Sequence, residues 1–435
     1  MNSRLRLLAA IVGILLLCTG CGEKTDSSVL TLCGGLSGDM VQMAGEKLHV
    51  AIKELDTFFF TDTMLLNRLV SHDDSVDIYY VSGDMVSTGT IFRKDFAAPI
   101  TYAPLLKTVS GMYAPIQAAV TQGDEVMGVP LLLATREHCL AYQLDTYAAC
   151  QEEGYTLPES WMALLEQIMH WDEELWALQI APVNMTPRIL IQSSLDMLLA
   201  WQQRNGKAAS FTSPEAMQVL EAAFQAAKNM EAHQADQMPN FLFYRQGLTV
   251  GRTEYEGFSA FPLPLFAGEE AVIPLRVGIA FINPYSRKQE AAQQFLQACY
   301  EAMEPTMRMA LSPKENHPVE NESVLGQIRL LQENIALQEE TLQHPDENLN
   351  RQEMEQQLAE NRKQLALAEQ QRYRVDDASL RQYGDMMTCA VVLTEQRWQE
   401  QSVSKLMDQL LQEKIPLSDF GREMERILSM QAAEK

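Results

Sequence analysis

The sequence is poor in cysteine, in basic residues and in long hydrophobic runs. Its 435 residues include seven cysteines, and after residue 21 none has the C-x-x-C spacing of a zinc or redox site. Lysine and arginine total 34 against 58 acidic residues, so the net charge is -24. A chain this acidic repels phosphate backbones and anionic lipid, which argues against a nucleic-acid partner. The hydrophobic fraction of 46% still suffices for sizeable cores in two lobes.

The N-terminus has the pattern of a cleaved export signal. Arg4 and Arg6 precede an apolar run, Leu7–Leu17, which is shorter than the ~20 residues that span a bilayer. Cys18-Thr19-Gly20-Cys21 follows, and the whole segment resembles a bacterial lipoprotein signal. The resemblance implies cleavage before Cys21 and a diacylglyceryl group on its thiol. An ordinary membrane anchor is the alternative interpretation.

The remaining cysteines are scattered and odd in number, which is not the pattern of a disulfide framework. We interpret them as small buried hydrophobic residues, and a disulfide between Cys139 and Cys150 remains an open alternative. They are Cys33, Cys139, Cys150, Cys299 and Cys389.

From residue 29 onward the pattern predicts a doubly wound α/β sheet. β-rich segments at Val29–Cys33, Val50–Ile52 and Val76–Val81 alternate with helix-like stretches, and such alternation implies parallel pairing. A polar tether, residues 22–28, separates this region from the signal. The sequence therefore predicts a folded body that begins at residue 29.

One five-residue motif occurs twice, each time directly after a predicted strand. Ser37–Val41 and Ser82–Val86 both read Ser-Gly-Asp-Met-Val. If the strand order runs 2-1-3, both motifs lie at the same sheet edge, where ligands of such sheets bind. Serine and aspartate supply hydrogen bonds suited to a hydroxyl-rich ligand, so Ser37, Asp39, Ser82 and Asp84 are candidate ligand-binding residues. The alternative is that they only cap the following helices.

The middle of the chain predicts several helices and one aromatic loop region. Pro158–Trp161, Thr212–Glu215 and Ser286–Gln289 are each typical of a helix start. Between the last two, residues 241–264 are aromatic and punctuated by glycine, and we select Tyr244 and Tyr255 there as candidates for a pocket.

The composition changes over residues 320–372. Val324, Ile328, Leu331 and Ile335 repeat at steps of four, three and four, and a second such series starts at Met354. Since His344-Pro345-Asp346 interrupts them, the pattern predicts an antiparallel helical hairpin. A further amphipathic helix is expected over 406–430.

At this point the order of segments resembles the family 1 solute-binding proteins of bacterial ABC importers, a group often assigned to sugars. The motifs that carry the resemblance cover nearly the whole mature chain. They are Asn67–Ser71 leading into Val76–Tyr79, then Met127–Pro130, Tyr142, Pro158–Trp161, and Ile282–Pro284 continuing to Leu296.

The resemblance implies a two-lobed α/β fold of the type II periplasmic-binding-protein class, with the helical hairpin as an insertion and helices at the C-terminus. It implies a monomer without cofactor, metal or catalytic residues, anchored by lipid to the outer face of the bacterial cell membrane. The lobes would close on a small solute, a carbohydrate by expectation, and deliver it to a membrane permease. The expected parts are 1–20 signal peptide, 21–28 tether, 29–138 lobe 1, 139–274 lobe 2, 275–319 return to lobe 1, 320–372 hairpin, and 373–435 C-terminal helices packing on the lobes.

Two further residues are candidates for the pocket. Arg136 lies near where the family's first crossover between lobes begins, and it would hold an anionic group or pair with a glutamate of the other lobe. Asn184 follows an apolar run, Leu178–Pro182, and is either a strand-end residue facing the ligand or a plain turn residue.

Two other classes of function remain as alternatives. In an extracellular glycan hydrolase, Asp39 and Asp84 would act as the carboxylate pair. However, Gly35–Asp39 lacks the second glycine of a G-x-S-x-G elbow, and no H-E-x-x-H is present. In an envelope interaction lipoprotein, the hairpin of residues 320–372 would hold a partner.

Overall fold

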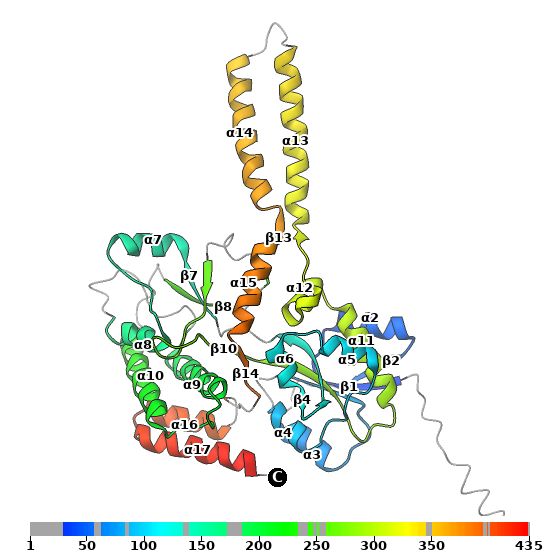
Figure 1. Cartoon of the computed structure of the whole chain (residues 1–435), viewed down its shortest axis with the longest axis vertical. Helices are drawn as coiled ribbons and strands as arrows, with labels where there is room; N and C mark the ends of the chain where they lie inside the picture. Colours follow the sequence, from blue (N-terminus) through cyan, green and yellow to red (C-terminus); the bar gives the residue numbers. More distant parts are fainter. Residues whose placement is uncertain are drawn as a thin grey trace, which may run out of the picture.

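The protein consists of two α/β lobes side by side, with a long helical hairpin that projects from between them (Figure 1). This computed structural model describes residues 29–55, 62–82, 87–133, 139–171, 185–233, 242–246, 250–251, 258–344, 350–394, 398 and 401–433.

The first lobe is built on a five-stranded sheet in the order β2-β1-β3-β11-β6. Strand β1 pairs in parallel with β2 and β3, whereas β11 runs antiparallel to β3 and β6. The first three strands therefore have the 2-1-3 order that a shared edge for the two Ser-Gly-Asp motifs requires. The strands are β1 (Val29–Cys33), β2 (Ala51–Leu55), β3 (Ile78–Val81), β6 (Val129–Leu133) and β11 (Val277–Ile282), and β4 (Thr121–Gln122) and β5 (Glu125–Val126) form a small ribbon.

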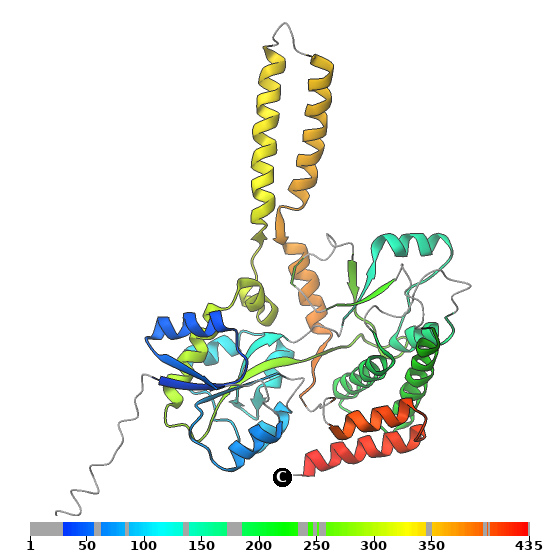
Figure 2. The same cartoon turned by 180° about the vertical axis from the view of Figure 1, so that it is seen from behind.

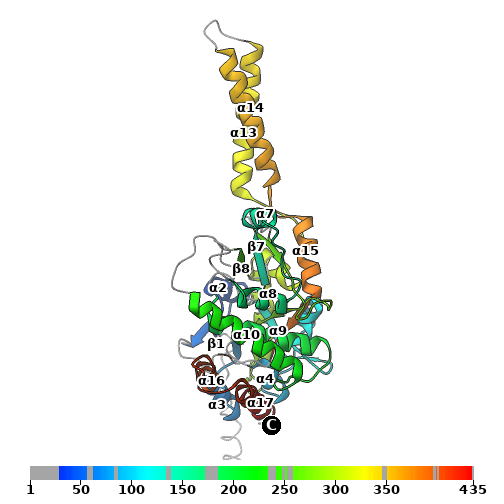
Figure 3. The ribbon, with the colours of Figure 1, turned by 90° about the vertical axis from the view of Figure 1, so that its left-hand side faces the viewer.

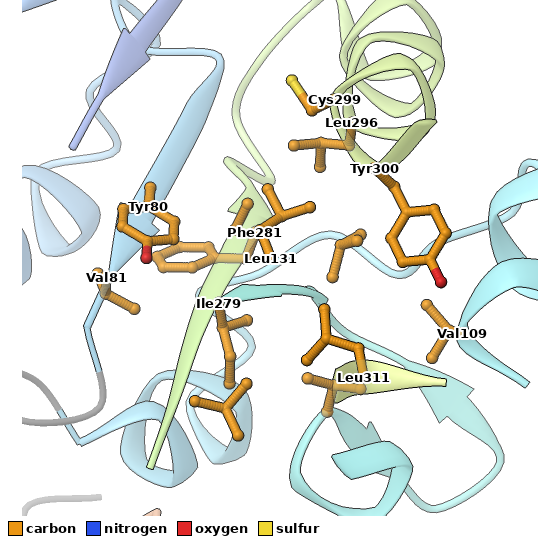
Figure 4. Close-up of a cluster of buried hydrophobic side chains, with 14 of the residues drawn as sticks. Tyr80, Val81, Val109, Leu131, Ile279, Phe281, Leu296, Cys299, Tyr300 and Leu311 are labelled. Carbon is orange, nitrogen blue, oxygen red and sulfur yellow. The ribbon is translucent and has the colours of Figure 1, made fainter. Parts of the chain in front are cut away.

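Helices cover this sheet and bury a continuous apolar core, part of which is shown in Figure 4. All four residues of β3 and all six of β11 are buried, as expected for strands covered on both faces. The helices of the lobe are α2 (Gly38–Leu48), α3 (Asp62–Val70), α4 (Thr88–Arg93), α5 (Ala103–Val109), α6 (Ala114–Ala119), α11 (Gln289–Ala302) and α12 (Pro305–Leu311).

A buried carboxylate ties the return segment to this sheet. Asp77 accepts hydrogen bonds from the Thr31 backbone N–H at 2.8 Å and from the Ser286 hydroxyl at 2.5 Å. The predicted helix start at Ser286 is therefore wrong in detail, because its side chain bonds to Asp77. Helix α11 begins at Gln289, with Lys288 in the N-cap position.

The second lobe has a three-stranded antiparallel sheet, β8-β7-β9, and its own apolar core. Its helices start where the sequence predicted, because Ser160 accepts a bond from the Ala163 N–H and Ser213 one from the Ala216 N–H. The elements are β7 (Cys139–Gln143), α7 (Leu144–Glu152), α8 (Trp161–Met169), α9 (Pro187–Arg204), α10 (Pro214–His233), β8 (Phe243–Gln246) and β9 (Phe258–Phe261).

The C-terminal helices pack on this second lobe. The single helix expected over 406–430 is wrong, since the structure has α16 (Gln401–Leu411) and α17 (Leu417–Ala433) instead. Pro416 precedes α17, and a proline there lacks an N–H and clashes with the preceding turn, so a continuous helix cannot form. On α17, Phe420 and Met424 are buried against this lobe.

A parallel two-strand ribbon joins the lobes: β10 (Ile273–Leu275) and β14 (Ala390–Val392). Side chains of successive strand residues point to opposite sides. In β14, Ala390 and Val392 belong to the core of the first lobe, whereas Val391 and the following Leu393 belong to that of the second. The chain leaves the first lobe after β6 and returns through β10 into β11 (Figure 2).

The hairpin is as predicted: α13 (Glu322–Gln343) and α14 (Arg351–Gln370) run antiparallel and extend well beyond the lobes (Figure 3). Ile328, Leu331 and Ala368 form a small core between them. Strands β12 (Val319–Glu320) and β13 (Tyr373–Val375) pair antiparallel at its base, and α15 (Asp377–Thr388) carries the chain back to β14.

Candidate functional site

The candidate site lies at the sheet edge from which the chain crosses to the second lobe. In register, Cys33 of β1 is opposite Tyr79 of β3, Val81 is opposite Ile279 of β11, and Val277 is opposite Leu133 of β6. The carboxyl ends of β1, β3 and β6 and the start of β11 therefore share one edge. This is the edge at which open α/β sheets bind their ligands.

Ser37 and Ser82 both lie at this edge, as the repeated motif predicted. Ser82 directly follows the last residue of β3, and Ser37 is the N-cap residue of α2. The Ser37 side chain is exposed and makes no capping hydrogen bond, so the interpretation that this hydroxyl serves only as a cap is wrong. Asp39 is exposed in the first turn of α2, where its carboxylate interacts favourably with the positive end of the helix dipole.

Two glycines make room for Tyr80 beside this edge. A Cβ on Gly34 would lie 2.4 Å from the Tyr80 carbonyl oxygen, and a Cβ on Gly278 would lie 2.2 Å from the Tyr80 hydroxyl oxygen. Burial raises the pKa of Tyr80 to about 12, so the phenol keeps its proton at neutral pH. These contacts fix β3 between β1 and β11 at the level of the candidate site.

A buried ion pair, which was not among the predicted site residues, connects the joining ribbon to the second lobe. Arg276, between β10 and β11, donates to both carboxylate oxygens of Asp196 on α9 at 3.0 Å. Asp196 also accepts a bond from the Trp398 indole N–H at 2.8 Å. The two charged side chains are only 4% and 3% exposed. No local signal could reveal a pair 80 residues apart in the sequence.

The segment after β14, where the chain passes between the lobes for the third time, is hydrogen-bonded to the first lobe. The Thr394 carbonyl accepts bonds from the Ser87 hydroxyl at 3.2 Å and from the Gly89 N–H at 3.4 Å, both at the start of α4. On the other side, Arg204 of α9 donates to the Thr388 carbonyl at 2.9 Å. The joining segments therefore have polar anchors in both lobes.

A cavity of about 200 Å³ lies where β6, α12 and β13 meet. Its walls are mostly apolar, with the Thr306 hydroxyl and the Arg374 guanidinium as polar groups, and it contains none of the predicted ligand residues. It suits an apolar group better than a hydroxyl-rich solute, which needs several convergent polar partners. The other lining residues are Leu132, Leu133, Val250, Gly251, Met303, Met307 and Ala310.

Six of the nine predicted site residues cannot be placed. Cys21, Asp84, Arg136, Asn184 and Tyr255 lie outside the described residues, as does the side chain of Tyr244, whose backbone pairs with Ala141. Their roles stay predictions.

Two tryptophans of the second lobe are part of its core and are not open to a ligand. Trp161 is 5% exposed and donates to the Ser194 hydroxyl at 2.9 Å, and Trp201 is 4% exposed and donates to Glu269.

Cys33, Cys150 and Cys299 are buried free thiols, as predicted, whereas Cys389 is only partly buried, so the prediction is wrong for it. Cys150 is a free thiol, so the bridge to Cys139 that the sequence left open does not form. Burial raises the pKa of Cys33 to about 11 and that of Cys299 to about 12, which leaves both protonated and unreactive.

Within the described ranges, no group of three or more His, Cys, Asp or Glu side chains is arranged to hold a metal ion. Likewise, none of the helices formed by the described residues combines the length and apolarity needed to cross a membrane.

No protein-family model and no curated protein sequence matches this chain. Solved structures do share its fold. A cyclic α-maltosyl-1,6-maltose binding protein from Arthrobacter globiformis matches with a TM-score of 0.54 at 12% identity, over 93% of this chain and 98% of its own. An ABC substrate-binding protein from Listeria monocytogenes in complex with cycloalternan matches with a TM-score of 0.54 at 12% identity, over 94% and 99%.

A maltose-maltodextrin binding protein from Alicyclobacillus acidocaldarius matches with a TM-score of 0.50 at 12% identity, over 92% of this chain and 100% of its own. At such low identity the likeness concerns the fold. The fold class predicted from the sequence, a two-lobed α/β binding-protein fold, is thereby confirmed.

Proposed function

We propose that the protein is the substrate-binding component of an ABC importer, which captures a small solute between its two lobes and delivers it to a membrane permease. The observation that carries this proposal is the architecture: two cores of separate residues, joined by a narrow ribbon, with several strand ends meeting at the edge between them. Such lobes can change their relative angle, and a ligand that contacts both favours the closed form.

Carbohydrate is the proposed solute class. The exposed Ser37 hydroxyl and Asp39 carboxylate at the sheet edge offer donors and acceptors of the kind that sugar hydroxyls need. The cyclic α-maltosyl-1,6-maltose binding protein from Arthrobacter globiformis and the Listeria monocytogenes protein in complex with cycloalternan share this fold, and this supports the assignment by analogy.

The N-terminal signal supports a second part of the proposal, which concerns location. Cleavage before Cys21 and lipidation of its thiol would anchor the protein to the outer face of the bacterial membrane, next to the permease. Mass spectrometry of the protein from membranes tests this directly: the N-terminal peptide should begin at a diacylglyceryl-modified Cys21. An unmodified peptide beginning upstream of residue 21 would contradict it.

The solute is tested by a melting-temperature screen of residues 22–435 against mono- and oligosaccharides, amino acids and polyamines. A ligand that binds only the native state at 100 times its Kd stabilises the protein by about 2.7 kcal/mol. For lobes of this size that corresponds to a rise of roughly 5 to 10 °C. A rise with sugars alone is expected, and a rise with none of the three classes would contradict the proposal.

Variants locate the site within the same assay. The variant Ser37→Ala should reduce the sugar-dependent rise while keeping its melting temperature without sugar, because the Ser37 side chain caps nothing. Glu290→Ala is the matched control, since Glu290 is exposed on α11, which follows the opposite end of β11. Equal losses in both variants would argue against a site at this edge. Product analysis of the incubated oligosaccharides should show no cleavage, and turnover would favour the hydrolase instead.

A further inference from the structure

The two hairpin helices pack against each other through one row of residues on each helix, which we call the inner seam. On α13 the inner seam contains Val324, Ile328, Leu331 and Ile335, spaced by four, three and four residues. The residues one position before them repeat with the same spacing and form a second seam. Residues spaced in this way lie along one face of a helix and are typical of helices that pack against a partner. The row on α13 contains no charged residue: Ser323, Gln327, Leu330, Asn334, Leu337 and Thr341.

The second helix continues this seam on the same side. In an antiparallel pair of helices, the residues one position before the inner seam on each helix face the same side of the hairpin. Asn361 donates to Gln338 at 3.1 Å and Arg362 to Glu339 at 2.7 Å, which fixes the register of the pair. The row on α14 that joins the seam carries two charges, at its first and third members: Glu353, Gln357, Glu360, Gln364, Leu367 and Gln371.

Three leucines of this seam are exposed to solvent. Leu330, Leu337 and Leu367 are 58%, 63% and 52% exposed, so no other part of the described chain covers them. Single exposed leucines are common on proteins, but three on one face of a projecting element mark a contact surface. The opposite side of the hairpin differs, because it carries the ion pair between Arg362 and Glu339.

The size of this face matches what a dimer needs. A helix of 22 residues such as α13 is about 33 Å long, and two neighbouring helices are about 20 Å wide. A face of these dimensions would bury roughly 1,300 Å² in total when two copies pair, which lies in the range of stable interfaces.

Charge favours a second copy on this face over any other self-contact. Two chains of net charge -24 repel each other over most of their surface. The seam carries only two carboxylates and lies on an arm that extends away from the lobes, so it can pair while the acidic bodies stay apart (Figure 3).

We propose that the protein self-associates through this hairpin face, with the leucine-bearing seams of two copies forming a four-helix bundle. The proposal replaces the expected monomer and is independent of the solute-binding function.

Sedimentation velocity of residues 22–435 at rising concentration tests it. The wild-type chain should show a reversible dimer that tightens as salt is raised, because salt screens the repulsion between the bodies. Leu330→Glu/Leu337→Glu should raise the dimer dissociation constant by more than about tenfold. Ala336→Glu/Ala366→Glu adds the same charge on the other side of the hairpin and should change it little; alanine, leucine and glutamate are all good helix formers.

A variant that strengthens association guards against a failure to fold. Glu360→Leu removes a charge from the seam and should tighten the dimer in either relative orientation of the hairpins, whereas Glu355→Leu outside the seam should not. A monomer at every concentration and salt, or equal effects of the seam and control variants, would overturn the proposal. Solute binding would be unaffected in either case, so this result is separable from the proposed function.

Discussion

The candidate edge depends on two residues that have no side chain, Gly34 and Gly278. Both positions lie against Tyr80, and a side chain at either would occupy the space of its atoms. Gly34 also has a φ of 138°, a conformation that other residues rarely adopt. The packing of β1 against β3, and hence the position of Ser37, therefore requires glycine.

Replacing Gly34 should be far more damaging than replacing its neighbour. Gly34→Ala combines backbone strain with a clash and should lower the free energy of unfolding by about 3 kcal/mol. Gly35→Ala is the control, because Gly35 has no atom within 4 Å of its added Cβ and no positive φ. Its effect should stay within about 1 kcal/mol in chemical denaturation. Similar losses in the two variants would contradict this view of the edge.

The ion pair between Arg276 and Asp196 makes a second prediction at this scale. Asp196→Asn leaves the buried guanidinium without its countercharge, which should destabilise the protein by about 3 kcal/mol or more. Adding Arg276→Met should recover part of the loss, since an apolar side chain of similar size removes the buried charge.

Thermal denaturation of the single and double variants measures both effects. The exposed pair between Arg426 and Glu423 supplies the comparison, and Glu423→Gln should cost less than about 1 kcal/mol. If Asp196→Asn behaves like Glu423→Gln, the pair does not hold the joining ribbon to the second lobe.

At the scale of elements, local pattern decided what could be predicted. The strand at Val29–Cys33 and the helix start at Trp161 follow from periodicity and capping, which act over a few residues. The division between α16 and α17 was missed because apolar residues continue on both sides of Pro416. The role of β14 could not be predicted at all, since it depends on two cores assembled from distant segments.

The same contrast between local patterns and long-range contacts applies to the candidate site. The shared edge of Ser37 and Ser82 was predictable because parallel strands with a 2-1-3 order bring the ends of β1 and β3 together. The contacts of Tyr80 with two glycines and of Arg276 with Asp196 were not, because they join residues far apart in the sequence.

The hairpin should be removable without harm to the lobes. Its base is a ribbon in which Val319 pairs with Val375 and Glu320 with Tyr373, so a short glycine-rich turn can replace residues 322–370. We expect the shortened chain to keep its melting temperature and its sugar-dependent rise, because the hairpin core is separate from both lobe cores. Loss of solute binding in a folded shortened chain would contradict a solute site built from the two lobes alone.

At the scale of the whole molecule, the joining segments determine which motion is available. Successive residues of β14 insert into opposite cores, so the lobes cannot slide along each other without withdrawing them. Rotation about the ribbon of β10 and β14 disturbs these contacts least, and it is the hinge motion that capture of a solute requires.

Solution scattering can detect this rotation. A sugar that raises the melting temperature should also lower the radius of gyration of the shortened chain, in which the hairpin no longer dominates the scattering. A sugar without effect on the melting temperature is the control and should leave the curve unchanged. An unchanged curve at saturating concentration of the binding sugar would show that the lobes do not close on it, because a ligand shifts this equilibrium only by its preference for one form. The solute would then be held by one lobe alone, and the separation of the two cores would need another explanation.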